Sequence, residues 1–308
     1  ILVLRGIDDY QKAREFFKPK LEDIHSPFLM KDMQLAVDRI ASAIENGEKI
    51  LVYGDYDVDG TTAVSLMYLY LSKIVEKKYL DFYIPDRYSE GYGISDEGIN
   101  FAKENGFSLI IALDCGIKAL DKIEYAISLG IDFIICDHHL PGEELPKAFA
   151  VLDPKRTDCR YPYKELSGCG VGFKLCQGLN TIYKIPENEL YELTDLLAIS
   201  IAADIVAMTG ENRVLAKLGL KTLRKTRKLG IRLLIPEEKI ATFDISNIVF
   251  EIAPKINAAG RISHGKAAVE LMISDNLKHA HQIVNDILNL NDSRRELDAN
   301  TTQSAFNQ

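Results

Sequence analysis

The sequence predicts an α/β protein built on a mostly parallel sheet. Two observations support this prediction. Short apolar segments alternate with segments of helical periodicity over the first half of the chain, and most of them are apolar along their whole length. Strands of that kind are covered by helices on both faces, which is the arrangement of parallel sheets. Five strands are expected, at 49–55, 80–86, 109–116, 132–139 and 148–154.

Helical periodicity fills the intervals between these strands and most of the chain after them. Helices are expected beside the sheet at 30–47, 61–74, 95–105 and 120–129. No strand is expected after Asp153. Helices are expected at 168–183, 189–208 and 212–229, followed by a mixed segment at 243–256 and helix from Gly265 onward. The predicted organisation is an α/β core (1–160), a helical subregion (161–265) and the start of a long connecting helix (266–308).

The composition limits the classes of protein. The chain has 308 residues, of which 47% are hydrophobic, so it can bury a sizeable core, and it has no apolar run long enough for a membrane span. A net charge of -8 argues against a generic duplex-DNA binder but not against a nucleic-acid enzyme, because charge distribution matters more than the total. Five cysteines without C-x-x-C spacing indicate buried thiols, a reducing compartment and hence the cytoplasm.

Polar residues follow several of the predicted strands. Asp55 and Asp114 end the first and third strands, and Asp137, His138 and His139 end the fourth. The carboxyl ends of parallel strands meet at one edge of a sheet, where ligands bind. Two adjacent imidazoles are also costly to bury without partners. We therefore expect these residues to converge on one site.

The segment DYDVDG, which begins at Asp55, places carboxylates at every second position before a glycine. It looks like the start of a calcium-binding EF-hand loop. However, Leu66 occupies the twelfth position, where such a loop needs glutamate, and a strand rather than a helix precedes the segment. Two interpretations stay open: the aspartates cap the following helix, or they bind another metal.

Asp204 is the sole charged residue of the apolar run from Leu196 to Gly210, which we expect to be helical. A lone buried carboxylate is costly unless it is paired, metal-bound or bonded to backbone at the sheet edge. With the clusters above, the candidate ligands are five carboxylates and one or two histidines, without a thiolate. That donor set favours Mn²⁺ or Mg²⁺ over structural zinc. Two such ions can clamp a phosphoryl centre and lower the pKa of a bridging water.

In this order, DYDVDG, LDCG, DHH and the Asp204 segment resemble the four motifs of the DHH phosphoesterase superfamily. GDYDVDGTTA, PDRYSEGYGIS, CDHH with the later DPKR, LSGCGVGFKL and IAPKINAAGRI resemble more narrowly its branch of single-strand-specific exonucleases. The resemblance covers nearly the whole chain from residue 30 on. It implies a 5′-to-3′ exonuclease that hydrolyses single-stranded DNA in repair and recombination, uses two Mn²⁺ or Mg²⁺ ions, and has single-strand-binding protein and a helicase as partners.

The resemblance also implies a set of metal ligands. Asp114 would bridge two ions. Asp55 and Asp57 would hold one ion. The other ion would be held by Asp59, His138 and Asp204. A metal-bound hydroxide would be the nucleophile.

Other residues are expected to act on the substrate. The resemblance implies that His139 contacts the scissile phosphate or assists as an electrophile or proton donor, and that Asp137 orients a histidine. Arg87, past a strand end, and Arg261, after small residues that allow close approach, are candidates for phosphate contacts, with a surface salt bridge as the alternative for each. Asn257 has either a structural or a substrate-contact role.

Residues 213–232 hold eight basic residues and no acidic ones. On a helix they would form a basic stripe that either tracks a nucleic-acid backbone or is an ordinary solvated face.

Two other classes of function remain as alternatives. A small-molecule DHH phosphoesterase would act on pyrophosphate, cyclic dinucleotides or very short oligonucleotides, but such relatives usually carry His in the first motif and lack the NAAGR segment. A binding scaffold that has lost catalysis would lack ligand residues, whereas every expected ligand position is filled here.

The family also carries features that this sequence lacks. A second lobe with a GGHxxAAG motif follows the connecting helix and grips the strand, and bacterial exonucleases of this type add an oligonucleotide-binding fold. No such motif stands in these 308 residues. We therefore expect the chain to be the catalytic lobe of a longer protein.

Overall fold

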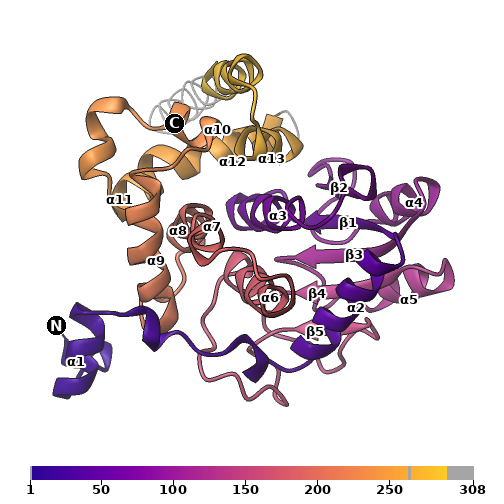
Figure 1. The fold of residues 1–308 in the computed structure, drawn as a ribbon, viewed down its shortest axis with the longest axis horizontal. Coiled ribbons are helices and arrows are strands. Elements are labelled where there is room, and N and C mark those ends of the chain that lie inside the picture. The colour runs from indigo at the N-terminus through magenta and orange to yellow at the C-terminus, as the bar shows by residue number, and fades with distance from the viewer. Residues whose placement is uncertain (1, 263–264, 290–308) are drawn as a thin grey trace, which may run out of the picture.

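The computed structural model describes residues 2–262 and 265–289. Within this part of the chain, five strands form one sheet in the order β2-β1-β3-β4-β5, and every neighbouring pair is parallel (Figure 1). The strands are β1 Lys49–Gly54, β2 Leu80–Tyr83, β3 Phe107–Leu113, β4 Asp132–Cys136 and β5 Ala150–Leu152. The predicted fold class is therefore confirmed, and the sheet is parallel throughout.

The helices fall into two sets. The first set precedes or alternates with the strands and comprises α1 Tyr10–Phe17, α2 Met33–Glu45, α3 Val58–Leu71, α4 Asp96–Glu104 and α5 Leu120–Ser128. The second set follows them and comprises α6 Gly168–Tyr183, α7 Glu187–Tyr191, α8 Thr194–Ala203, α9 Gly210–Leu223, α10 Leu229–Leu234, α11 Ile245–Asn247, α12 Ala253–Ile262 and α13 Gly265–Ile273. A π-helical turn, Ile248–Ile252, joins α11 to α12, and residues 277–289 are also helical. Short 3-10 turns occur at Val3–Arg5, Leu21–Asp23, Pro27–Leu29, Lys77–Tyr79 and Glu237–Thr242.

Alternate residues of the strands enter two different cores. Ile50 and Val52 of β1 pack with α2, α3 and α6 on one face of the sheet. Leu51 and Tyr53 pack with α4 and α5 on the other face. Because both faces are covered, the strands are apolar at most positions on both faces, which is the pattern that predicted a parallel sheet.

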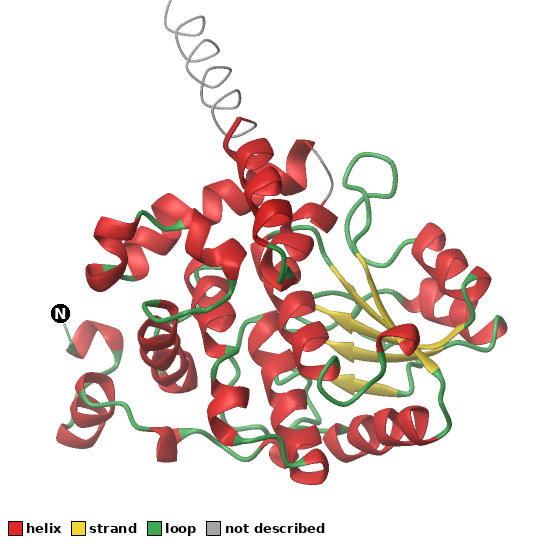
Figure 2. Cartoon of the chain, turned by 45° about the horizontal axis from the view of Figure 1, so that its top comes forward, coloured by secondary structure: helices red, strands yellow, loops and turns green. Residues whose placement is uncertain are grey.

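The helical region lies at the carboxyl edge of the sheet. The strand arrows point toward it in Figure 2, and α8 packs against both α3 and α9. This arrangement brings residues near 200 to the same edge as the strand ends. Within the described residues, no helix combines the length and apolar character that a membrane crossing requires.

Four of the predicted helices have wrong boundaries, and one of them, the helix expected at 212–229, ends at Leu223. The helix expected at 61–74 begins at Val58, because the Asp57 side chain accepts the amide of Gly60 and caps it there. The helix expected at 189–208 is split into α7 and α8 and ends at Ala203, since Ile205 adopts a left-handed φ of 55°. The helix expected from Gly265 onward breaks at 274–276, where Asn276 caps a new helix by accepting the amide of His279. Positions 290–308 of this prediction lie outside the described residues.

Candidate metal centre

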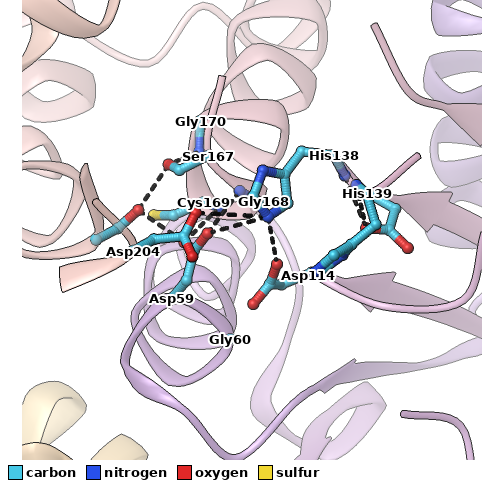
Figure 3. A network of polar contacts seen from close by, with 12 residues as sticks. Asp59, Gly60, Asp114, His138, His139, Ser167, Gly168, Cys169, Gly170 and Asp204 are labelled. Carbon is cyan, nitrogen blue, oxygen red and sulfur yellow. Dashed lines mark hydrogen bonds and ion pairs between the residues drawn. The ribbon is translucent and has the colours of Figure 1, made fainter. Parts of the chain in front are cut away.

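The carboxyl ends of β1, β3 and β4 each place an aspartate at the same edge of the sheet. Asp55, Asp114 and Asp137 directly follow these strands. Asp114 has a left-handed φ of 60°, and its amide donates to the carbonyl of Cys136 at 2.8 Å. The turn after β3 is therefore tied to β4, and the Asp114 side chain faces the histidines that follow β4 (Figure 3).

His138 lies among three carboxylates (Figure 3). Its Nε2 is 3.1 Å from Oδ1 of Asp114, 3.6 Å from Oδ2 of Asp204 and 3.8 Å from Oδ2 of Asp59. The ligand atoms of Asp59, His138 and Asp204 all lie within 4.8 Å of one another, and those of Asp114, His138 and His139 form a second such group. The first group contains the same three residues that the family resemblance assigns to one ion.

Asp59 is held by the N-terminus of α6. Its Oδ2 accepts the amide of Gly168 at 2.7 Å, and its Oδ1 accepts the amide of Cys169 at 2.9 Å and the hydroxyl of Ser200 at 2.7 Å. A helix N-terminus favours a negative charge. Position 168 requires glycine, because a Cβ there would stand 2.5 Å from the Cβ of Asp114. Tertiary contacts therefore fix both the charge and the direction of Asp59.

Asp204 occupies a different position from the one that the sequence predicted. It is the C-cap residue of α8 rather than an interior helical residue, and its side chain is 27% exposed rather than fully buried. The turn at Ile205 ends the helix at the sheet edge, so that the Asp204 carboxylate reaches His138.

Asp137 holds His139. Its Oδ1 lies 2.7 Å from Nδ1 of His139 and also accepts the amide of His138, while its Oδ2 accepts the amide of Ile117. The hydrogen bond to Asp137 raises the pKa of His139, whereas burial lowers the pKa of His138. With Nδ1 committed, Nε2 of the half-exposed His139 remains at the surface, 3.4 Å from the hydroxyl of Tyr92.

Burial and mutual repulsion raise the pKa of most carboxyls in the centre. The pKa of Asp55 rises to about 7, chiefly by burial and then by the charge of Asp57. The pKa of Asp204 also rises to about 7, by burial and then by the charge of Asp59. Burial and the charges of neighbouring aspartates, Asp59 first among them, raise the pKa of Asp114 well above its usual range. A divalent cation would supply the positive charge that this cluster lacks.

Buried polar atoms without partners provide an independent test of metal binding. Among the described residues, both carboxylate oxygens of Asp55, Oδ1 of Asp114 and both ring nitrogens of His138 are buried without a hydrogen bond, and the 3.1 Å contact between Nε2 of His138 and Oδ1 of Asp114 is an ion pair only if the imidazole is protonated. Such atoms are ordinarily satisfied. Oxygen and imidazole donors without a thiolate suit Mn²⁺ or Mg²⁺. The residues present therefore fit divalent cations of this kind.

Asp55 and Asp57 do not belong to either group of ligand atoms that the described residues form. Asp57 caps α3, since its Oδ1 accepts the amide of Gly60 at 2.9 Å. The capping interpretation of the DYDVDG segment therefore applies to Asp57, whose second oxygen is not needed for the cap. Asp55 caps nothing, and its two unpartnered oxygens make it the stronger candidate of the pair for direct metal contact.

The three residues expected to contact phosphate or substrate lie in two different parts of the fold. Arg87 is exposed in the loop after β2, and its guanidinium carbon lies 5.1 Å from the ring centroid of Tyr56, the residue after Asp55. Asn257 is half-buried on α12. Arg261 also lies on α12, and its side chain is not among those that the structure describes.

The basic stripe predicted at 213–232 does not form on one helix. α9 ends at Leu223, so Lys225 and Arg232 lie beyond it. Several of the cations bind elsewhere in the protein: Arg213 donates to the carbonyl of Phe16, and Lys228 pairs with Asp195 at 2.8 Å. The expectation of one continuous helix is therefore wrong, and part of the stripe anchors neighbouring segments instead of facing solvent.

Two polar residues at the centre have no role in the sequence-based prediction. Asp153 directly follows β5 and is fully buried, just as Asp137 follows β4. The strand-end rule that selected Asp55 and Asp114 would have selected it as well. Ser200 donates to Asp59, and it carries no sequence signal because the contact spans 141 positions.

Comparison with known proteins defines the class first. A family model for the DHH family, N-terminal domain, matches residues 49–201. The single-stranded-DNA-specific exonuclease RecJ of Bacillus subtilis (strain 168) is 44% identical over 99% of this chain and 38% of its own length. The protein of the same name from Escherichia coli (strain K12) is 34% identical over 87% of this chain and 48% of its own length. The chain thus spans less than half the length of these two relatives.

Solved structures agree with this match. A crystal structure of exonuclease RecJ bound to manganese has a TM-score of 0.81 and 31% identity, covering 89% of this chain and 69% of that chain. RecJ from Thermus thermophilus in complex with Mn²⁺ has a TM-score of 0.82 and 27% identity, and the match covers 100% of this chain and 43% of that chain. The Thermus thermophilus protein in complex with Mg²⁺ has a TM-score of 0.71 and 25% identity, and the match covers 100% of this chain and 40% of that chain.

The chain belongs to the DHH family of phosphoesterases, as its Asp-His-His site indicates. Within that family it is a homologue of RecJ.

Proposed function

We propose that this chain carries the catalytic centre of a two-metal-dependent exonuclease that degrades single-stranded DNA from its 5′ end in repair and recombination. One observation supports the proposal above all: His138 lies within 4 Å of carboxylates from three separate elements. The relatives named as single-stranded-DNA-specific exonucleases supply the substrate class. The five buried free cysteines are consistent with a reducing, cytoplasmic location.

The geometry supports part of the proposed set of metal ligands, and the family resemblance supplies the rest. Asp59, His138 and Asp204 would hold one ion, and Asp114 lies beside His138, where it could contact two ions. Asp55 would hold the second ion, and Asp57 would contribute its non-capping oxygen. When bound, Mn²⁺ or Mg²⁺ would lower the pKa of a water and neutralise phosphate charge.

His139 is the residue best placed to act on the phosphodiester itself. Asp137 binds its Nδ1 at 2.7 Å and favours the protonated ring, which leaves Nε2 facing outward as a donor. From there it can bind a phosphate oxygen or give a proton to the leaving oxygen. Arg87 is exposed in the loop after β2, beside the ring of Tyr56, and would attract the phosphate backbone.

The test is digestion of 5′-labelled single strands, duplexes and dinucleotides with Mn²⁺ or Mg²⁺. We expect mononucleotides from long single strands, loss of this activity with Asp114→Ala, and full activity with Asp38→Ala, which removes an exposed carboxylate of α2. Calorimetric titration with Mn²⁺ should show weaker binding for Asp114→Ala and unchanged binding for Asp38→Ala. Hydrolysis confined to dinucleotides, cyclic dinucleotides or pyrophosphate would favour a small-molecule phosphoesterase instead.

A further inference from the structure

A chain of buried hydroxyl groups leads to Asp59 from inside the protein. Ser200 donates to Oδ1 of Asp59 at 2.7 Å, and the hydroxyl oxygens of Ser200 and Ser167 are 2.6 Å apart. Ser167 in turn accepts the amide of Gly170 at 3.1 Å (Figure 3). Both serines are 0% exposed, so bulk water does not compete for these contacts. The proposed function gives neither serine a role.

The direction of each hydrogen bond in this chain follows from the groups themselves. An ionised carboxylate can only accept hydrogen bonds, so the single hydroxyl proton of Ser200 points at Asp59. The contact between the two serines then uses the proton of Ser167. The Ser200 hydroxyl is therefore held in one orientation, and each bond of the chain strengthens the next.

The two carboxylate oxygens of Asp59 are occupied unequally. Each oxygen can accept about two bonds. Oδ1 already accepts two, from Ser200 and from the amide of Cys169 at 2.9 Å. Oδ2 accepts one, from Gly168, and lies 3.8 Å from Nε2 of His138. One position on Oδ2 is therefore what Asp59 offers to an ion.

Helix α8 links this arrangement to a second candidate ligand. Ser200 and Asp204 are four residues apart at the end of α8, so they lie on the same face of the helix. Oδ2 of Asp204 is 3.6 Å from Nε2 of His138. One helical turn thus supplies one candidate ligand and holds another, so the two carboxylates keep a fixed relation.

From this geometry we propose that Ser200, oriented by Ser167, limits Asp59 to one metal bond and thereby selects Mn²⁺ or Mg²⁺ over Ca²⁺. The inference rests on the metal centre of the proposed function. Mg²⁺ binds octahedrally at about 2.0–2.1 Å, whereas Ca²⁺ takes about six to eight oxygens at about 2.3–2.6 Å and often binds both oxygens of a carboxylate. Mn²⁺ is also smaller than Ca²⁺. With Oδ1 committed to the protein, Asp59 cannot give Ca²⁺ that second oxygen.

The test is a competition of Ca²⁺ against bound Mn²⁺, in which electron paramagnetic resonance measures free Mn²⁺. Titration with Mn²⁺ alone gives the affinity for Mn²⁺, the competition gives that for Ca²⁺, and neither needs substrate. Wild type should bind Mn²⁺ more tightly than Ca²⁺. Ser200→Ala should lower this preference about tenfold, because Mn²⁺ loses a supported ligand and Ca²⁺ gains the freed oxygen.

Three further variants separate the hydroxyl group from packing. Ser200→Thr keeps the hydroxyl and should keep the wild-type preference. Ser200→Cys keeps the approximate volume but is only a weak donor, so it should lower the preference even if Ser200→Ala fails to fold. Ser65→Ala is the matched control and should change neither affinity, since Ser65 is also fully buried but donates to the carbonyl of Thr61.

Three outcomes would overturn the proposal. A loss of affinity for both ions by the same factor in Ser200→Ala and Ser200→Cys would mean that Ser200 only supports the fold. Unchanged affinities would mean that Oδ1 has no influence on the ion. Equal affinities of wild type for Mn²⁺ and Ca²⁺ would leave no selectivity to explain. If the preference changes as expected but wild type degrades no single strands, the exonuclease function fails and the role of Ser200 stands.

Discussion

Asp153 allows a direct test of how burial at the carboxyl edge of the sheet changes the pKa of a carboxyl group and the stability of the protein. It is fully buried, its Oδ1 accepts the amide of Lys155 at 2.6 Å, and its Oδ2 has no hydrogen-bond partner among the described residues. Burial, with the charge of Asp137 as a further cause, raises the pKa of Asp153 from 3.8 to about 7. The folded protein therefore holds this proton more tightly than the unfolded chain does, and stability falls as pH rises from about 4 to about 7.

Asp153→Asn should remove this loss, because asparagine is neutral at every pH and its amide oxygen can still accept the Lys155 amide. At about 1.4 kcal/mol per pKa unit, the full effect is about 4 kcal/mol, of which about 2–3 kcal/mol develops between pH 5 and pH 8. Urea unfolding in EDTA across this range, with a constant m-value, measures the difference between variant and wild type.

The control is Glu143→Gln, which neutralises an exposed carboxylate and should shift stability by a similar small amount at every pH. A difference between Asp153→Asn and wild type that stays flat from pH 5 to pH 8 would refute the reasoning. It would mean that the Asp153 carboxylate is solvated or paired in solution.

Three further substitutions test single contacts. Gly168→Ala should lower the free energy of unfolding by about 1–3 kcal/mol and disturb metal binding, because the added Cβ would clash with the Cβ of Asp114. Gly170→Ala is the control, since a Cβ there meets only ordinary contacts and should be tolerated. Thermal melts and Mn²⁺ titration distinguish the two variants. Lys174→Met should cost about 3–5 kcal/mol in urea unfolding, because it leaves the buried Glu211 unpaired. Asp57→Asn should keep the α3 cap and hence stability but weaken Mn²⁺ binding, so unchanged binding would leave Asp57 as a cap alone.

The sheet was predictable because its signal is local. Most strands are nearly continuous apolar runs, and an aspartate directly follows β1, β3, β4 and β5, so these strands and their carboxyl ends could be located from the sequence. Helix ends in the second half were not predictable in the same way. The apolar run through α8 continues to Met208, and hydrophobicity does not encode the left-handed turn at Ile205 that ends the helix.

The fate of individual charges depends on distant partners. The basic residues of 213–232 have helical spacing, but Arg213 and Lys228 are bound by groups that fold against them from elsewhere in the chain. In the same way, the amides of Gly168 and Cys169 reach Asp59 across more than a hundred positions. Sequence spacing identifies candidates for a site, whereas tertiary contacts decide which of them stay free to bind a ligand.

The three aspartates of DYDVDG illustrate this last point. Asp55 follows the end of β1, Asp57 is the N-cap of α3, and Asp59 lies in the first turn of α3. The three carboxylates therefore lie in different environments although they are only two positions apart. Asp59 is held by three donors, Asp57 commits one oxygen to the helix, and Asp55 is buried with neither oxygen satisfied. An unsatisfied buried carboxylate is the costliest of the three and gains most from a cation. Metal binding at this edge should therefore depend on Asp55 at least as strongly as on Asp57, although the two residues have the same chemistry.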